Sequence, residues 1–198
     1  MKARLLRAAI GIVLVALSVL LGRYLGQEPD SDAWMPLEHA LVGVAQPLAV
    51  GFTWLCYPAV LVPLGVGLLV VALVRREWLG RIALLLASML VSWRLADALQ
   101  RVFARPRRDD WVYKHELSFS YPSSHAAITF GFYVFLGVLV AMQQSGPRRG
   151  WVVLTTGLLA AGILWSRLAL GAHYATDLLG GILVGSGSAC FLSAFLSI

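Results

Sequence analysis

Long apolar runs separated by short polar segments dominate this chain. A run of about 20 mostly apolar residues is long enough to cross a lipid bilayer as an α-helix. The pattern therefore predicts six transmembrane helices, at approximately residues 8–26, 50–74, 82–103, 123–142, 151–168 and 174–197.

Several residues within and between these runs predict local features. The second run contains Pro58 and Pro63, which a membrane helix tolerates with a kink. The third contains Arg94 and Asp97, three residues apart, which we expect to pair with each other or with polar groups of a site. Apolar residues three and four apart predict a short amphipathic interfacial helix over Ala33–Ala45. The last run contains glycines that would let another helix approach closely: Gly180, Gly181, Gly185 and Gly187.

The composition supports the same class of protein. Hydrophobic residues make up 59% of the 198 residues and charged residues 13%, and the mean hydropathy is +0.78, whereas soluble domains are about half apolar and a quarter charged. We therefore expect an all-α, polytopic membrane protein whose six helices form one bundle and a single domain over residues 1–198. The net charge of +6 does not indicate a nucleic-acid partner, because the basic residues lie in short clusters between apolar runs. Cys56 and Cys190 lie inside apolar runs and are expected to be packed core residues.

Basic residues predict how the bundle is oriented. Met1–Arg7 is basic and precedes an apolar run, as in a signal peptide, but no clear cleavage site follows, so we interpret it as the cytoplasmic end of the first transmembrane helix. The turns at 75–81 and 143–149 are also basic, which places them in the cytoplasm. The loop 101–121 and the segment 166–177 then share the outer face of the cell (inner) membrane, toward the periplasm or exterior. Because this outer loop is itself basic, we expect its bases to serve a site.

The segment Ser166–Asp177 carries charged residues where an apolar environment makes charge expensive. If a helix begins near Gly171, His173 and Asp177 lie four residues apart on one face. The carboxylate could then hold one imidazole nitrogen and leave the other free for chemistry, while Arg167 offers a planar cation for a phosphate or carboxylate. The alternative is structural: a His–Asp pair that caps a helix, with an arginine that extends to the interface.

Two further polar clusters are predicted on the same face. Pro122 before Ser123 and Ser124 indicates a helix start, where free N–H groups and the helix dipole attract an anion. His125 follows in the first turn, and the run Gln100–Arg108 adds several arginines. Arginines, a helix N-terminus and two histidines favour a phosphate dianion over a neutral ligand.

These clusters resemble the three signature motifs of the type 2 phosphatidic acid phosphatase family, membrane lipid phosphatases related in fold to vanadium haloperoxidases. The family patterns are Lys-x6-Arg-Pro, Pro-Ser-Gly-His and Ser-Arg-x5-His-x3-Asp. The third is matched in full from Ser166 to Asp177, and the second at Pro122, Ser123 and His125, with Ser124 in place of glycine. Motif order, spacing and the six-span layout extend the resemblance over roughly the whole chain after the first helix.

The first motif departs from the family pattern. The preferred alignment places Gln100 at the lysine, Arg107 at the arginine and Arg108 at the proline. A shifted register keeps Arg105-Pro106 but places Ala98 at the lysine. Either way one phosphate-binding cation is missing, and Arg101 or Arg105 could replace it.

The resemblance implies a role for each matched residue. His173 would be the nucleophile that forms a phosphohistidine, Asp177 would orient it, and His125 would be the general acid that protonates the leaving oxygen. The phosphate oxygens would be held by residues that donate hydrogen bonds to them: Arg107, Arg167, Ser123, Ser124 and Gln100. A pocket built from arginines needs no metal or other cofactor, and the sequence contains no carboxylate cluster of the kind that Mg²⁺ requires.

A site at the outer membrane face predicts a substrate taken from the membrane lipids. The first hypothesis is a phosphatase acting on a lipid phosphate or diphosphate, with undecaprenyl diphosphate as the best single candidate. Phosphatidic acid, phosphatidylglycerol phosphate and lipid A phosphates are close competitors. The alternatives are a non-hydrolytic lipid-binding or transport relative and a lipid phosphotransferase, although binding alone needs no nucleophile. The sequence does not predict an oligomeric state.

Overall fold

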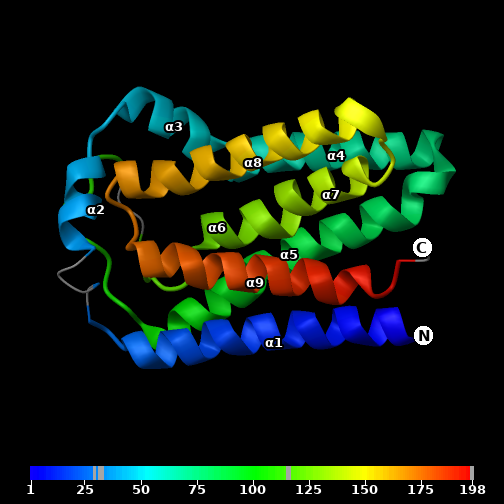
Figure 1. Ribbon diagram of the computed structural model, residues 1–198. Coiled ribbons are helices and arrows are strands. Elements are labelled where there is room, and N and C mark those ends of the chain that lie inside the picture. The colour runs from blue at the N-terminus through cyan, green and yellow to red at the C-terminus, as the bar shows by residue number, and fades with distance from the viewer. Residues whose placement is uncertain (29, 31–33, 115–116, 197–198) are drawn as a thin grey trace.

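The computed structural model describes residues 1–28, 30, 34–114 and 117–196, and within these ranges the regular secondary structure is helical. The elements are α1 (Lys2–Leu25), α2 (Met35–Leu41), α3 (Gln46–Trp54), α4 (Pro58–Val74), the 3₁₀-helix η1 (Arg76–Trp78), α5 (Leu79–Phe103), α6 (Ser124–Ile128), the π-helix η2 (Thr129–Val134), α7 (Phe135–Ala141), α8 (Gly146–Ala169) and α9 (Ala175–Ser193). The long helices lie side by side in a bundle with both termini at one end (Figure 1). The predicted all-α class is confirmed.

The helices also fit the predicted membrane spans. Among the described residues, α1, α8, α9 and the continuous helical stretches Arg76–Phe103 and Ser124–Ala141 are long and apolar enough to cross a membrane. Helices α3 and α4 add a sixth span if they count as one helix bent by 43°. The bend lies directly before Pro58, as predicted, whereas Pro63 is accommodated inside α4. The last predicted span extends to residue 197, which lies outside the described residues, and α9 ends at Ser193.

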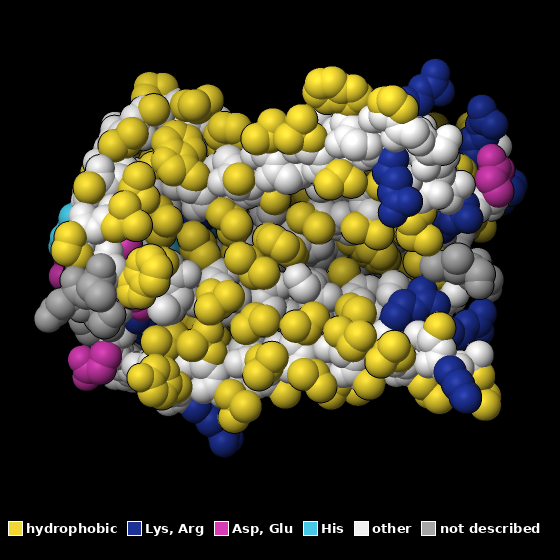
Figure 2. Space-filling view, viewed as in Figure 1, with side chains coloured by type: hydrophobic (Ala, Val, Ile, Leu, Met, Phe, Trp, Pro, Cys, Tyr) yellow, Lys and Arg dark blue, Asp and Glu magenta, His cyan; other side chains and the backbone are white. Residues whose placement is uncertain are grey.

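The two ends of the bundle differ in charge. Figure 2 shows hydrophobic side chains along the flank of the bundle, with Lys and Arg gathered toward the end that holds the termini. This end also holds the α4–α5 and α7–α8 turns, which are the basic turns of the sequence (Figure 1). Such an asymmetry is typical of membrane proteins with the basic end in the cytoplasm.

Glycines bring α9 into close contact with α1 and α6. A Cβ atom at Gly181 would lie 2.7 Å from the Cβ of Ala126 in α6, and one at Gly11 in α1 would lie 2.6 Å from the carbonyl oxygen of Gly187. No side chain fits at such distances, so the backbones can approach this closely only at glycine. The start of α9 therefore lies against the start of α6, which brings together two of the polar clusters.

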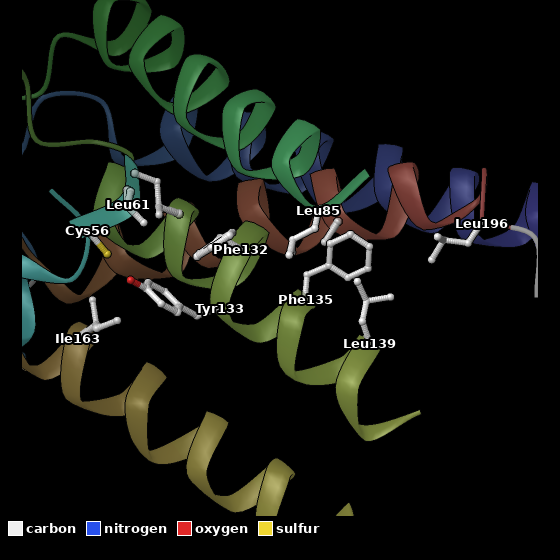
Figure 3. Packing of buried hydrophobic residues seen from close by; sticks show 11 residues of the cluster. Cys56, Leu61, Leu85, Phe132, Tyr133, Phe135, Leu139, Ile163 and Leu196 are labelled. Carbon is white, nitrogen blue, oxygen red and sulfur yellow. The ribbon is translucent and has the colours of Figure 1, made fainter. Parts of the chain in front are cut away.

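The aromatic residues of η2 and α7 fill the centre of the bundle. Figure 3 shows Phe132, Tyr133 and Phe135 packed among residues from other helices, including Leu85 of α5 and Ile163 of α8. The Tyr133 hydroxyl donates a hydrogen bond to the carbonyl of Leu55 at 2.6 Å. The break between α3 and α4 leaves backbone carbonyls without a helical partner, and this hydroxyl satisfies one of them.

The interfacial helix differs from its prediction over Ala33–Ala45. Helix α2 covers only Met35–Leu41, and residue 33 lies outside the described part of the chain. Its acidic residue Glu38 is 1% exposed and accepts hydrogen bonds from Arg108 Nη1 at 2.6 Å and from the backbone N–H of Ala175 at 2.7 Å. Helix α2 therefore connects the loop after α5 to the start of α9.

Arg94 and Asp97 do not pair with each other, which was the first of the two expectations for them; Asp97 lines the groove described below. Asp97 accepts a hydrogen bond at 2.8 Å from Arg101, one helical turn further along α5. The guanidinium carbon of Arg94 lies 5.0 Å from the centre of the Trp93 ring. An acid four residues before a base is the favoured arrangement on a helix, which explains the choice of partner.

Candidate functional site

The three polar clusters meet at the end of the bundle opposite the termini. The end of α5, the starts of α6 and α9 and the end of α8 lie there together (Figure 1). Backbone hydrogen bonds connect them: Ser123 N–H donates to the carbonyl of Asp177 at 3.0 Å, and Val112 N–H to that of Leu170 at 3.1 Å. The predicted convergence is therefore present.

His173 precedes α9 and does not lie within a helix. Gly171 has φ +67° in the turn after α8, so the helix start near Gly171 that was considered for this pair is absent. Helix α9 begins at Ala175, next to the predicted start of the last span at residue 174. The pair nevertheless forms, with 3.5 Å between His173 Nδ1 and Asp177 Oδ2. Asp177 reaches back over the start of its helix and also accepts a hydrogen bond from Tyr174 N–H at 2.9 Å. Asp177 thus both caps the helix and faces the imidazole, which combines the two interpretations of the sequence.

The Asp177 carboxylate is fixed from several sides. Its Oδ1 accepts a hydrogen bond from Arg105 Nη1 at 2.7 Å, and its Oδ2 accepts one from the hydroxyl of Ser120. Asp177 and His173 are both buried. A carboxylate that is held in place holds the imidazole beside it and directs Nδ1 toward itself.

The opposite side of the imidazole faces a guanidinium group. Arg107 Nη1 lies 3.3 Å from His173 Nε2 and also donates to the carbonyl of Ala172 at 2.9 Å. The remaining nitrogens of Arg107 donate to the carbonyl and hydroxyl of Ser118, each at 2.7 Å. His173 therefore lies between a carboxylate at Nδ1 and a cation at Nε2.

Arg167 is fully buried and shares a neighbour with Arg107. It donates a hydrogen bond to the hydroxyl of Thr53 in α3 at 2.5 Å. The Trp111 ring centre lies 5.2 Å from the guanidinium carbon of Arg107 and 5.7 Å from that of Arg167. An aromatic face attracts cations at these distances, so Trp111 helps to position both arginines. Thr53 and Trp111 were not predicted as residues of the site, although an isolated threonine in an apolar segment was a usable signal for Thr53.

The second cluster forms the predicted helix start. Ser123 is the N-cap of α6, and its hydroxyl oxygen accepts a hydrogen bond from Ala126 N–H at 3.4 Å. His125 is buried in the first turn, with its ring 5.4 Å from that of Tyr57. Within the described part of the chain, His125 Nε2 is buried without a hydrogen-bond partner. An unsatisfied buried polar atom is costly, and a ligand that hydrogen-bonds to it would remove that cost.

Gln100 holds the start of α6. Its side-chain nitrogen donates to the carbonyl of Pro122 at 2.9 Å and to the hydroxyl of Ser124 at 3.0 Å. An amide nitrogen carries two hydrogens, so both donors are used. At the position where the family motif has lysine, this chain therefore has a neutral group whose hydrogens bind the residues at the start of α6.

Arg105 does not replace the missing cation. Its nitrogens donate to the carbonyl of Glu28, to Asp30, to Thr176 and to Asp177, which engages all five donors in a fully buried position. Arg101 pairs with Asp97 on an exposed part of α5. Arg105 thus braces Asp177, and the alignment that places Arg107 at the motif arginine agrees better with the geometry.

Arg108 forms a second buried clamp. It donates to Glu38 at 2.6 Å and to both carboxylate oxygens of Asp110, at 2.8 and 2.5 Å. The hydrogen bonds from Arg108 lower the pKa of Asp110. Burial raises the pKa of Glu38, although the hydrogen bond from Ala175 partly opposes this effect. The clamp secures the loop above the site rather than adding a phosphate ligand.

A groove of about 480 Å³ extends from this site into the bundle. Its polar end includes Gln100, Ser118, Ser124 and His125, together with Asp97. The remainder is mostly apolar and lies between α4, α5 and α6: Leu61, Val62, Met89, Leu90 and Ile128 are among its residues. This arrangement suits a ligand with a polar head and an apolar chain. Among the residues that the structure describes, no three His, Cys, Asp or Glu side chains are grouped as metal ligands would be.

Comparison with known proteins gives a consistent result. The family model of the PAP2 superfamily matches residues 81–197. The chain is 32% identical over 115 residues to the putative undecaprenyl-diphosphatase YbjG of Escherichia coli (strain K12), a match covering 56% of this chain but only 53% of that relative. It is 29% identical over 161 residues to phosphatidylglycerophosphatase B of Bacillus subtilis (strain 168), covering 75% of this chain and 76% of the relative.

A solved structure supports the fold. The crystal structure of a transmembrane PAP2-type phosphatidylglycerolphosphate phosphatase from Bacillus subtilis superposes with a TM-score of 0.76 and 23% identity, covering 93% of this chain and 94% of the other. Because the family model covers more than half of the sequence, this multi-pass membrane protein belongs to the PAP2 superfamily.

Proposed function

We propose that this protein removes phosphate from a lipid phosphate or diphosphate through a phosphohistidine intermediate, at the outer face of the cell membrane. The observation that carries the proposal is the position of His173. Its Nδ1 lies 3.5 Å from the Asp177 carboxylate and its Nε2 lies 3.3 Å from the Arg107 guanidinium. An oriented imidazole with its reactive nitrogen beside a phosphate-binding group is the arrangement that attack on phosphorus requires.

The proposed first step transfers the phosphoryl group to His173. Nε2 attacks phosphorus in line with the leaving oxygen, a nitrogen–phosphorus bond forms and the phosphorus–oxygen bond to the lipid breaks. His125 donates its proton to the leaving oxygen, which is the lipid alcohol of a monoester or the lipid monophosphate of a diphosphate. Asp177 stabilises the positive charge that the imidazole ring gains.

The second step returns the enzyme to its starting state. A water molecule attacks the phosphohistidine, His125 accepts a proton from it, and the nitrogen–phosphorus bond breaks to release inorganic phosphate. The unpartnered Nε2 of His125, noted above among the described residues, supports this role because it is available to a proton donor or acceptor.

Arginines and a helix start would stabilise the transferred group. Arg107 and Arg167 would hold the equatorial phosphate oxygens, where charge spreads in the transition state. Ser123, Ser124 and the N–H groups at the start of α6 would add neutral donors. Gln100 would act through Ser124, since its own amide hydrogens are engaged.

The groove supports a lipid as the substrate. Its polar end contains His125 and Ser124, and its apolar part lies among membrane-spanning helices. The phosphate would sit at the polar end while the hydrocarbon chain lies in the apolar part. We propose undecaprenyl diphosphate as the first candidate, which agrees with the name of the E. coli relative. Phosphatidylglycerol phosphate is the second, because the match to the B. subtilis phosphatidylglycerophosphatase covers 75% of this chain.

Phosphate release by the purified protein tests the proposal. Wild type and His173→Ala would be assayed in detergent, with EDTA present, on undecaprenyl diphosphate, phosphatidylglycerol phosphate and phosphatidic acid. We expect release that survives EDTA and disappears in the variant, and the ranking of rates would identify the substrate. His39→Ala is the matched control, because the His39 side chain is 56% exposed and outside the site.

Other outcomes would favour other functions. Lipid binding without release in the wild type would support a binding or transport protein, and release from the donor only when an acceptor lipid is added would support a phosphotransferase.

Rapid quenching with ³²P-labelled substrate should trap an acid-labile, base-stable phosphoprotein. If His173→Ala still forms it, the assignment of the nucleophile is wrong.

Cysteine labelling tests the orientation of the site. In a background with Cys56 and Cys190 replaced, Lys114→Cys should react with a membrane-impermeant maleimide in intact cells. Arg76→Cys, in the turn at the opposite end, should react only after the cells are opened. The reverse pattern would place the site on the cytoplasmic side.

A further inference from the structure

A second groove lies between η2–α7 and α8, apart from the candidate active site. Its volume is about 510 Å³, within the range of about 300–1,000 Å³ that is typical of ligand sites. None of the described residues that line it belongs to the three motif clusters. The residues that line it include Met142 and Arg149, on either side of the α7–α8 turn, so one end of the groove, its mouth, lies at the basic end of the bundle.

One face of α8 forms a wall of this groove. Arg149, Val153, Gly157, Ala160 and Leu164 recur at spacings of three and four residues, so they lie along one stripe of the helix. The stripe is about 22 Å long, from the α-helical rise of 1.5 Å per residue. Half of a bilayer's hydrocarbon core is about 15 Å thick. With Arg149 at the headgroup level of one leaflet, the stripe would extend past the middle of the membrane.

Glycine keeps the groove open. A Cβ at Gly157 would meet no atom within 4 Å, whereas one at Gly137 of α7 would lie 2.5 Å from Cγ2 of Thr156. The two helices thus touch at Gly137 and Thr156, and space remains beside Gly157. That space is bordered by apolar residues from η2 and α7, including Phe130 and Val134.

The mouth of the groove is positively charged. Among the described residues that line it, Arg149 alone carries a charge. Arg149 is exposed in the first turn of α8, and its neighbour Arg148 is exposed as well. Ser145 at the N-cap forms no side-chain hydrogen bond to the helix, so the N–H groups of Gly146 and Arg148 are not capped by its hydroxyl, while Pro147 between them has no N–H.

We propose that this groove binds an anionic phospholipid from the leaflet at the basic end of the bundle. The negatively charged headgroup contacts Arg149 and the start of α8, and one acyl chain lies along the α8 stripe beside Gly157. The mouth is basic, and the groove behind it is apolar and as long as one leaflet is deep. A lipid fits both parts, whereas a free anion would leave the apolar part unfilled. The site is separate from the proposed phosphatase site and does not depend on it.

Native mass spectrometry of the full-length protein tests this assignment. The protein would be released from nanodiscs that contain equal amounts of phosphatidylserine and phosphatidylcholine, neither of which carries the terminal phosphate of a phosphatase substrate. We expect the wild type to retain one phosphatidylserine. Arg149→Gln should reduce the phosphatidylserine preference about five-fold, the equivalent of about 1 kcal/mol for one basic residue at an anionic headgroup. Gly157→Leu should lose the bound lipid.

Matched controls distinguish a built site from general attraction. Arg148→Gln removes an adjacent exposed charge that does not line the groove, and Gly67→Leu adds a side chain to α4 at a glycine that also has open space around it. Both should keep the lipid. Equal losses in Arg149→Gln and Arg148→Gln would mean only diffuse attraction to a basic end, and lipid retained in Gly157→Leu would mean an unoccupied groove. Either result would overturn the proposal. If Gly157→Leu fails to fold, the comparison of Arg149→Gln with Arg148→Gln still decides it.

Discussion

Replacing Gln100 by lysine tests how the neutral residue at the motif's lysine position affects the rate of phosphate release. The Gln100 side chain is buried, and its two amide hydrogens donate to the Pro122 carbonyl and the Ser124 hydroxyl. A lysine ammonium carries three hydrogens. It can therefore keep both contacts and direct a third, charged donor toward a phosphate in the adjoining groove.

The size of the effect follows from the donor that lysine adds, because both amide hydrogens of Gln100 are already engaged. A hydrogen bond to a charged group contributes about 1.5–3 kcal/mol. The gain in transition-state stabilisation is therefore about 1.5–3 kcal/mol, which corresponds to an increase in kcat/KM of about 10- to 150-fold. Gln100→Met is the comparison of similar size without donors. It leaves the buried Pro122 carbonyl unpaired, so we expect it to lose about 1–3 kcal/mol of stability and some activity.

Initial rates of phosphate release on the three lipid substrates, with thermal unfolding in the same detergent, would measure both effects. The expected order of kcat/KM is lysine above glutamine above methionine. If the lysine variant is folded but no faster than the methionine variant on every substrate, residue 100 does not act on the phosphate, and the proposed position of the phosphate beside Ser124 is wrong.

Two further predictions concern the buried clamps. Arg105→Lys replaces a planar fork, whose Nη1 and Nη2 reach Asp177 and Asp30, by one compact ammonium, so one of the two carboxylates loses its cation. We expect about 3–5 kcal/mol lower stability and a fall in kcat larger than any rise in KM, and an unchanged melting temperature would contradict this. Arg108 lowers the pKa of Asp110 in the folded state, so this contact stabilises the protein above the ordinary pKa of 3.8 and is lost as the pH falls through the lowered pKa. Asp110→Asn should therefore melt below the wild type at neutral pH, with the difference vanishing in acid; a difference independent of pH would contradict the assignment.

The spans and the polar clusters could be predicted because each depends on local sequence. Apolar runs of sufficient length are themselves the signal for a membrane helix. Once the runs are counted, the alternation of sides places the loop after α5 and the turn between α8 and α9 at the same end. The start of α6 was predictable for a similar reason, since Pro122 and Ser123 provide both a helix initiator and an N-cap.

Long-range side-chain partners could not be predicted in this way. Arg105 meets Asp30 and Asp177 across 75 and 72 residues of sequence, and Arg108 meets Glu38 across 70. No periodicity relates such positions. The same limit applies to the π-helix η2 and to the side chain of Thr53, whose roles depend on how neighbouring helices pack.

The basic loop after α5 illustrates how charge counting and geometry differ. Charge counting predicts that the bases of this loop serve a site. In the structure, most of these bases pair with carboxylates. Arg101 pairs with Asp97. Arg105 pairs with Asp30 and Asp177, and Arg108 pairs with Glu38 and Asp110. Arg107 is the base of this loop that borders His173. Buried pairs of this kind add little net stability, but removing one partner is costly, so they hold a single arrangement. The loop is therefore basic mainly because it is fastened by ion pairs, and that fastening keeps Asp177, and through it His173, in position.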